Sequence, residues 1–250
     1  CRRVSRPAAG AQSGRLIFSV FGRTIIVMSA LRIVVLAVLL ALPALPAGAG
    51  GRDDFRAGEE ARRVLNIEEA LRLYSLAIQS GDLTDQELAT AHYRRGLVRG
   101  GAGLNGAAIE DFSATIRIDR NHGYAHSLRG YLHGIAGRFA AAEEDHNAAV
   151  ALAPSIKSDT YLPWALQHYA DLRRRQRRFD EALEMLERAL KVREYPTVHF
   201  RRAWVRVDMG RNDLARADYE RWLKAGGSAA NYWPDERATV ERLRTLPDTR

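Results

Sequence analysis

The sequence predicts an all-α fold in which antiparallel helix pairs stack one after another and a last helix closes the C-terminal end. Two observations predict it: a self-similarity at an offset of 34 residues, and small residues that recur within the repeated unit. The segment Ala91–Gly96 matches Ala125–Gly130, and the register continues through Gly103 with Gly137, Ala108 with Ala142, and Asp111 with Asp145. A two-helix unit with a glycine turn accounts for this pattern, because small residues are needed where two helices touch.

The N-terminal part predicts an export signal. A single positive residue, Arg32, precedes an apolar run from Ile33 to Leu42, and a small-residue stretch ends at Ala49. The run is shorter than the ~20 apolar residues of a membrane span. We therefore expect residues 28–49 to be a cleavable signal peptide and residues 1–27 to be upstream translation foreign to the protein. The expected location is the periplasm of a Gram-negative bacterium, or outside the cell.

Charge and cysteine usage narrow the function classes. The formal net charge is +8, but six of the 38 basic residues lie in the first 49 residues, which carry no acid. The remainder has 32 basic and 30 acidic residues, so nothing suggests the basic face that nucleic-acid binding requires. The only cysteine, Cys1, excludes an internal disulfide and a cysteine-based metal or redox site.

Two more units follow the first two. Their small and aromatic positions are Ala170, Phe179, Ala182 and Ala189 in one, and Ala203, Gly210, Ala215 and Tyr219 in the other. This spacing resembles the tetratricopeptide repeat family. The resemblance implies a right-handed superhelix, a tetratricopeptide repeat solenoid, that acts as a non-enzymatic scaffold for protein–protein interaction. It places repeats at residues 89–122, 123–156, 163–195 and 196–229.

The flanking segments complete the array. Residues 50–84 form a degenerate first helical hairpin, in which Asn66 followed by Glu69 is a helix-start signature. Residues 230–250 form the capping helix and tail, with Pro234 near the helix start. Residues 157–162 are an insertion between two repeats.

Two positions depart from the family's pattern. The bulky aromatic residue early in the first helix is replaced by His92, His126 and His199. The tyrosine later in that helix is replaced by Arg99, His133, Arg173 and Arg206.

Arginine and aspartate recur together inside the repeats. The arginines are Arg95, Arg129 and Arg202, and sixteen residues after each comes an aspartate: Asp111, Asp145 and Asp218. In the third repeat both change, to Tyr169 and Met185, and the first hairpin has Ala57 and Leu73. A ligand clamp or acid–base machinery is the functional alternative. Joint presence and joint loss favour structural ion pairs between the two helices of one repeat.

No pattern indicates catalysis, a cofactor or a metal. Residues 101–106 spell G-x-G-x-x-G, but a helix precedes them, so we interpret them as an interhelical turn rather than a dinucleotide site. The spacing of His122, His126 and His133 matches no zinc pattern, and we expect these residues to pack. The run from Arg173 to Arg178 is interpreted as a solvated helix end, with contact to acidic peptide, lipid or glycan as the alternative.

The resemblance also implies a binding groove. In the family, first helices line the concave surface, and the residues at inward-facing positions are Tyr93, Arg94, Tyr124, Tyr131, Trp164, Arg174, Arg175, Phe200, Arg201 and Trp204. Aromatic side chains and arginine dominate interface energetics, so we expect a protein or peptide partner there. The Lys/Asn clamp of chaperone-tail-binding members is absent. The alternative is a membrane-anchored structural envelope protein, which would keep the apolar segment uncleaved and use the arginine run.

Overall fold

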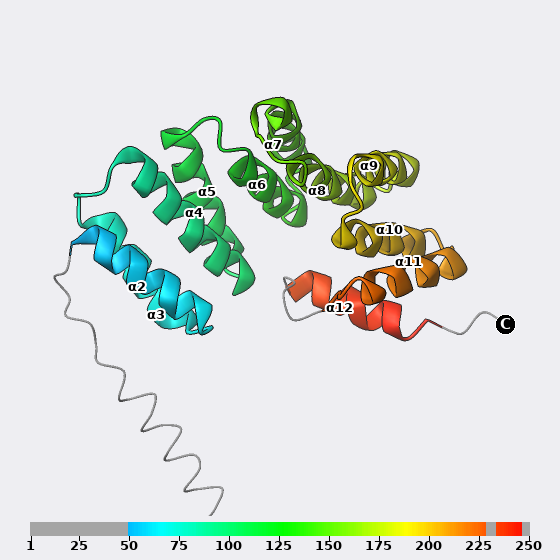
Figure 1. The fold of residues 1–250 in the computed structure, drawn as a ribbon. Helices are drawn as coiled ribbons and strands as arrows, with labels where there is room; N and C mark the ends of the chain where they lie inside the picture. Colours follow the sequence, from blue (N-terminus) through cyan, green and yellow to red (C-terminus); the bar gives the residue numbers. More distant parts are fainter. Residues whose placement is uncertain (1–49, 229–233, 247–250) are drawn as a thin grey trace, which may run out of the picture. The chain divides into compact units, whose positions relative to one another are not determined.

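The computed structural model describes residues 50–228 and 234–246, and within these ranges every regular element is a helix (Figure 1). The predicted signal peptide and upstream segment lie outside the described residues. The helices form consecutive antiparallel pairs: α2 (Gly51–Arg63) with α3 (Ile67–Gln79), α4 (Asp85–Gly101) with α5 (Asn105–Ile118), α6 (Gly123–Ile135) with α7 (Phe139–Ala151), α8 (Tyr161–Arg175) with α9 (Phe179–Val192), and α10 (Pro196–Asp208) with α11 (Asn212–Lys224). A 3₁₀ turn, Ala153–Ser155, follows α7, and α12 (Pro234–Arg244) comes last. The predicted fold class is confirmed.

Local capping sets several helix starts. The α4 helix begins at Asp85 because Thr84 and Glu87 form a capping box, in which the Thr84 backbone N–H donates to the Glu87 carboxylate at 2.9 Å. The predicted repeat boundary, residue 89, is four residues later, since the repeat pattern marks packing positions rather than caps. Asn66 caps α3 by accepting from the Glu69 N–H at 3.3 Å, as its spacing predicts.

The small residues lie where the helices of a pair approach most closely. A Cβ atom added at Gly96 would lie 2.8 Å from the Phe112 ring, and one at Gly130 would lie 3.0 Å from the Asp145 Cβ. The equivalent Ala170 is fully buried. The close approach explains why the repeated pattern is built on glycine and alanine.

The turns between paired helices share one backbone conformation. Gly103, Gly137 and Gly210 have φ values of 78°, 71° and 75°, the left-handed region that glycine adopts without strain. In the turn between α8 and α9 the corresponding residue is Arg177, with φ 61°. Gly103 belongs to the G-x-G-x-x-G sequence, which connects α4 to α5 as an interhelical turn.

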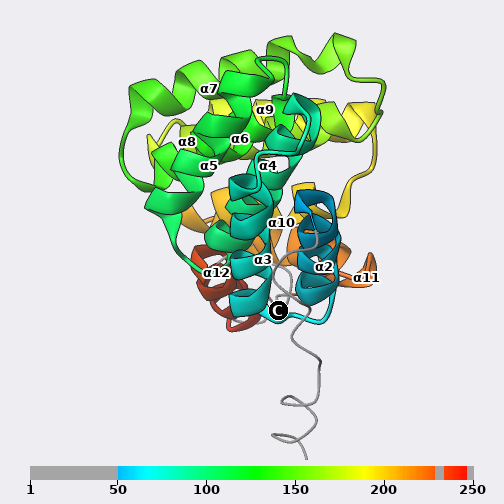
Figure 2. The same ribbon diagram turned by 90° about the vertical axis from the view of Figure 1, so that its left-hand side faces the viewer.

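The last helix covers the end of the array. In Figure 2, as in Figure 1, α12 lies beside α10 and α11, and it contacts both. Val240 and Leu243 of α12 are buried against Phe200, Trp204 and Trp222. The apolar surface of the final pair is thereby removed from water. In the part of the chain that is described, no helix is both long and apolar enough to span a membrane.

Candidate functional site

The three ion pairs that the spacing predicts are present in the structure. Their shortest N–O distances are 2.8 Å for Arg95–Asp111, 2.7 Å for Arg129–Asp145 and 2.7 Å for Arg202–Asp218. Each joins the first helix of a pair to its second helix, and all three aspartates are buried. Removing the arginine from a buried pair of this kind costs about 3–5 kcal/mol where no other charge takes its place. These residues therefore hold the helix pairs together.

A histidine three residues before the arginine lies beside each of these aspartates, and in the first two pairs it is hydrogen-bonded to the carboxylate. The Nδ1 atoms of His92 and His126 lie 3.1 Å from Asp111 and 3.2 Å from Asp145, and His199 Nδ1 lies 3.7 Å from the Asp218 carboxylate. The family's aromatic residue is thus replaced here by a hydrogen-bonding ring.

A second arginine completes two of the three clusters. Arg99 reaches Asp111 at 2.8 Å, and Arg206 reaches Asp218 at 2.6 Å. Burial alone would raise the pKa of Asp111, but the hydrogen bonds from His92 and Arg95 and the nearby positive charges hold it below its usual range. From the sequence alone, these histidine and arginine positions were recognised only as departures from the family's pattern. Each lies at a constant number of residues before its aspartate, and that spacing could have predicted the contacts.

The third repeat shows why both charges change together. Tyr169 and Met185 lie in one apolar cluster with Leu172. The Tyr169 hydroxyl donates to Asn147 Oδ1 at 2.9 Å and accepts from Arg173 at 2.8 Å. A lone arginine or aspartate in this cluster would lack its partner.

The interpretation of the arginine run as a solvated helix end is wrong for its first three members. Arg173 is buried and pairs with Glu143 at 2.6 Å. Arg174 and Arg175 pair with the buried Asp171 at 2.9 Å and 2.6 Å.

Arg174 is further held by a neighbouring pair of helices. It reaches Asp208 of α10 at 2.6 Å, and its guanidinium lies 3.8 Å above the Trp204 ring. Among the arginines of the run from Arg173 to Arg178, only Arg177 and Arg178 are exposed. This arrangement could not be predicted from the sequence, because Asp208 comes from the next pair of helices and a pattern within one repeat does not reveal contacts between repeats.

Five of the ten predicted groove residues meet in one pocket of about 350 Å³, here called the first-helix pocket. They are Tyr93 of α4, Tyr124 and Tyr131 of α6, Trp164 of α8 and Arg201 of α10. Each lies on the first helix of its pair. Tyr124 and Tyr131 are seven residues apart, two helical turns, which places both on the same face of α6.

The other five predicted residues lie elsewhere. Arg94 pairs with Glu59 at 3.5 Å, and Arg174 and Arg175 are engaged as described. Phe200 is fully buried in the core beneath α12, and Trp204 packs in the same core. Phe200 directly precedes Arg201 on a helix, so the two side chains point about 100° apart and only one faces the pocket.

The pocket's walls are mainly aromatic. The rings of Tyr124 and Trp164 lie 4.8 Å apart, and Trp164 contacts His168 edge-on at 4.5 Å. Burial lowers the pKa of His168 well below its usual value, so this ring is neutral. The remaining lining residues are Leu97, Leu128, Gln167, Tyr195, Thr197 and Glu236.

A buried ion pair lies in the polar part of the pocket. Arg201 pairs with Glu236, which comes from α12, and its guanidinium lies 5.3 Å from the centre of the Tyr131 ring. Asp171 lies 3.9 Å from Arg201 Nη1, and these acids help to raise the pKa of Arg201. Glu236 was not among the predicted groove residues, because it lies outside the repeats and meets Arg201 only through the docking of α12.

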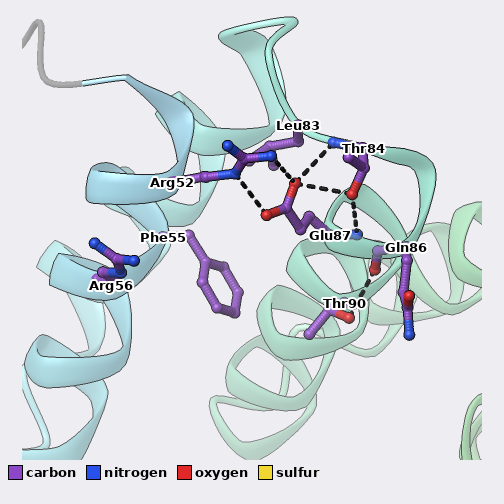
Figure 3. A pocket seen from close by; sticks show the side chains of 8 residues that line it. All are labelled: Arg52, Phe55, Arg56, Leu83, Thr84, Gln86, Glu87 and Thr90. Atoms are coloured by element: carbon purple, nitrogen blue, oxygen red, sulfur yellow. Dashed lines mark hydrogen bonds and ion pairs between the residues drawn. The ribbon is translucent and has the colours of Figure 1, made fainter.

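A second hollow, of about 490 Å³, lies between α2 and α4 (Figure 3). Arg52 pairs with Glu87 at 2.6 Å, and the same carboxylate accepts from the Thr84 hydroxyl at 2.8 Å. The Arg52 hydrogen bond is the main reason that the pKa of Glu87 falls to about 2. The acid that lines this hollow is thus already engaged within the fold.

Neither a metal site nor a reactive serine stands out in the described ranges. No group of three or more His, Cys, Asp or Glu residues there is arranged to hold a metal ion. Ser127 Oγ lies 3.3 Å from His168 Nδ1, but Ser127 is fully buried and out of a substrate's reach. This contact therefore belongs to the packing of α6 against α8.

The comparisons with known proteins agree on one family. Residues 122–194 and 170–233 match two sequence profiles described as tetratricopeptide repeat. No curated protein sequence matches the chain.

Solved structures share the fold at low sequence identity. A tetratricopeptide repeat protein from Parabacteroides merdae is 19% identical with a TM-score of 0.61, over 85% of this chain and 84% of that one. A thermophilic protein of the same kind from Thermus thermophilus is 18% identical, with a TM-score of 0.60 over 79% and 100% of the two chains. The Cut9–Hcn1 hetero-tetramer is 14% identical, with a TM-score of 0.59 over 77% of this chain and 36% of that chain.

Repeat arrays of this kind generally serve as scaffolds for protein–protein interaction. The matched profiles, the stacked helix pairs and the shared fold together lead to one conclusion: residues 122–233 consist of repeats of the tetratricopeptide repeat family, and the described part of the chain has the fold of that family.

Proposed function

We propose that the protein is a non-enzymatic adaptor that binds a segment of a partner protein in the first-helix pocket. The observation that carries this proposal is the convergence of four aromatic side chains and one arginine from four successive first helices on one pocket. Tyrosine, tryptophan and arginine are the residue types that most often carry binding energy at protein interfaces. The pocket's volume of about 350 Å³ falls within the ~300–1,000 Å³ range common to ligand pockets.

The chemistry of the walls suits a peptide segment. Tyrosine and tryptophan offer an apolar ring together with a polar tip, so they can bury an apolar side chain and still hydrogen-bond to a peptide backbone. Burial raises the pKa of Tyr93 to about 12, so its hydroxyl keeps its proton at neutral pH. One neighbour in fold, the Cut9–Hcn1 hetero-tetramer, is itself an assembly of two kinds of protein chain.

We further propose that the protein works in the periplasm or outside the cell. The support is the sequence of residues 28–49, with its positive start, short apolar run and small-residue end. N-terminal sequencing of the mature protein should find a start near Gly50.

The membrane-anchored alternative has weaker support. It relied on the run from Arg173 to Arg178 meeting lipid headgroups, yet the first three of these arginines are engaged in ion pairs inside the fold. A mature N-terminus that retained the apolar segment would favour an anchor over a cleaved signal.

Substitution of the pocket's aromatic wall tests the binding proposal. Peptides selected from a displayed random library against the purified protein should bind the Trp164→Ala variant at least about tenfold more weakly. Phe139→Ala is the matched control, since Phe139 is an exposed aromatic residue on the second helix α7 and should leave binding unchanged. Thermal unfolding would verify that both variants fold. Equal binding to Trp164→Ala and to the unaltered protein would contradict the proposal.

A further inference from the structure

The pair formed by Arg201 and Glu236 is unusual among the contacts of the capping helix. Both side chains line the first-helix pocket, and they are only 4% and 5% exposed. The two residues lie 35 positions apart, on α10 and on the first turn of α12. The apolar anchors of α12, Val240 and Leu243, lie further along the helix, in the core around Phe200. The ion pair and the apolar anchors are thus separate attachments of one helix.

The guanidinium of Arg201 has hydrogen-bonding capacity that the fold leaves unused. Its Nη2 atom donates to Glu236, whereas its buried Nε and Nη1 atoms have no hydrogen-bond partner. An unsatisfied buried donor costs roughly 1–3 kcal/mol. A carboxylate that took the place of Glu236 could accept from Nη2 and from a neighbouring donor, Nε or Nη1, in two parallel hydrogen bonds, the strongest arrangement for this pair of groups.

The charged side chains that line the pocket indicate that a ligand bound to Arg201 should carry a negative charge. Arg201 is the one basic side chain and Glu236 the one acidic side chain among the residues that line the pocket, and the neighbouring His168 is neutral. A ligand that displaced Glu236 without bringing a negative charge would remove the acid closest to Arg201, and the next one, Asp171, lies 3.9 Å away. An incoming carboxylate would restore the balance.

We propose that Glu236 is a built-in competitor for a partner's acidic side chain, and that the pocket recognises a protein segment in which Glu or Asp stands beside a large apolar residue. The acid takes the place of Glu236 on Arg201, and the apolar side chain packs between Tyr124 and Trp164. This inference rests on the proposed function and adds the kind of segment that is bound. The first turn of α12 has to move, while Val240 and Leu243 keep the helix attached.

Because one carboxylate replaces another on Arg201, we expect the partner segment to bind reversibly and with moderate affinity. Replacing one carboxylate by another leaves the ion pair nearly unchanged in number and sign, so it contributes specificity rather than most of the affinity. Burial of the apolar side chain against the aromatic walls supplies the driving force. The first turn of a helix opens more readily than its middle, which keeps the cost of moving Glu236 small.

The test compares acidic and neutral forms of the same peptide. Short peptides selected from a displayed random library would be synthesised with their Glu or Asp intact and with the matching amide. We expect the intact peptide to bind the unaltered protein about tenfold more tightly than the amide form. The Glu236→Gln variant, which removes the competing charge, should bind the intact peptide about tenfold more tightly still.

Two further variants separate competition from stability. Glu241→Gln, on the exposed side of the same helix, should bind like the unaltered protein. The double change Arg201→Met with Glu236→Met replaces a buried ion pair by apolar side chains, a change that folded proteins tolerate. It should bind both peptide forms equally.

Three results would overturn the inference. Selected peptides that lack an acid, or an affinity that Glu236→Gln leaves unchanged or weakens, would make the Arg201–Glu236 pair purely structural while the proposed function stood. A selection that yielded no peptide for either the unaltered protein or Glu236→Gln would reject the proposed function and this inference with it.

Discussion

At the residue scale, each aspartate that joins two paired helices is buried, and the residues around it are ones that can hydrogen-bond to its carboxylate. Asp145 receives Arg129 and His126, which reach it from the first helix of the same pair. Burial would raise the pKa of Asp145, but the hydrogen bonds from these two residues and their charges lower it. The arginine of this cluster was predictable from spacing alone. The histidine was not, because its position has a packing role in the family and its hydrogen bond appears only when the helices are placed.

A double-mutant cycle tests the pairing. Arg129→Ala and Asp145→Ala should each lower the free energy of unfolding by about 3–5 kcal/mol, because each removes the closest counter-charge of a buried partner. The double variant should lose less than the sum of the two. Chemical denaturation of the four proteins measures this. Additive losses would mean that the two residues do not interact.

Two buried histidines make stability depend on pH. Burial lowers the pKa of His146 to about 4 and that of His168 well below 6.5, so both are neutral in the folded protein. Unfolding lets them bind protons once the pH falls below about 6.5, the ordinary histidine value. Stability is therefore unaffected by these two groups above that pH and falls as the pH drops toward 4. The slope is about 1.4 kcal/mol per pH unit for each proton taken up.

Urea unfolding at several pH values measures this effect. His146→Phe, which keeps a ring in stacking contact with Tyr169, should flatten the slope between pH 6 and 4. Below that range the aspartates add a further loss of stability, since their lowered pKa values favour the folded state only while they are charged. A midpoint that did not change between neutral pH and pH 5 would contradict the assignment of neutral buried histidines.

At the element scale, the interhelical turns illustrate what the repeat pattern predicts well. Gly103 and Gly137 were located from sequence because a left-handed turn residue is nearly always glycine. The start of α4, four residues before the predicted repeat boundary, is set by Thr84 and Glu87 through a cap that the neighbouring repeats do not share. A repeat pattern predicts features that the units share, such as the turn glycines. It does not predict a feature that a single unit has, such as the capping box of α4.

Arg177 offers a test of the turn conformation. Its φ of 61° is strained for a residue with a Cβ atom, and its side chain is exposed. Arg177→Gly should therefore raise the free energy of unfolding by about 0.5–1 kcal/mol. Gly137→Ala, in the equivalent turn between α6 and α7, should lower it by a similar amount. A loss of stability in Arg177→Gly would show that its side chain matters more than its backbone.

At the scale of the whole molecule, the pocket depends on the angles between successive helix pairs. The resemblance to the family predicted that Tyr93, Tyr124 and Trp164 share the first-helix face, and the structure brings them to one pocket. It assigned Arg174 to the same surface, although Asp171 and Asp208 draw that side chain into the interior. Contacts between repeats determine whether such a side chain faces the pocket or the interior, and a pattern within one repeat does not predict those contacts.

Site-specific photo-crosslinking in the organism that makes the protein tests the central claim most directly. A photoreactive phenylalanine analogue would replace Tyr124, in the pocket, or Phe139, exposed on α7. If the first-helix pocket holds a partner, the analogue at position 124 should crosslink a defined second protein, and mass spectrometry should map the adduct to one segment of it. The analogue at position 139 should give no such adduct. A defined adduct from position 139 with none from position 124 would contradict the account.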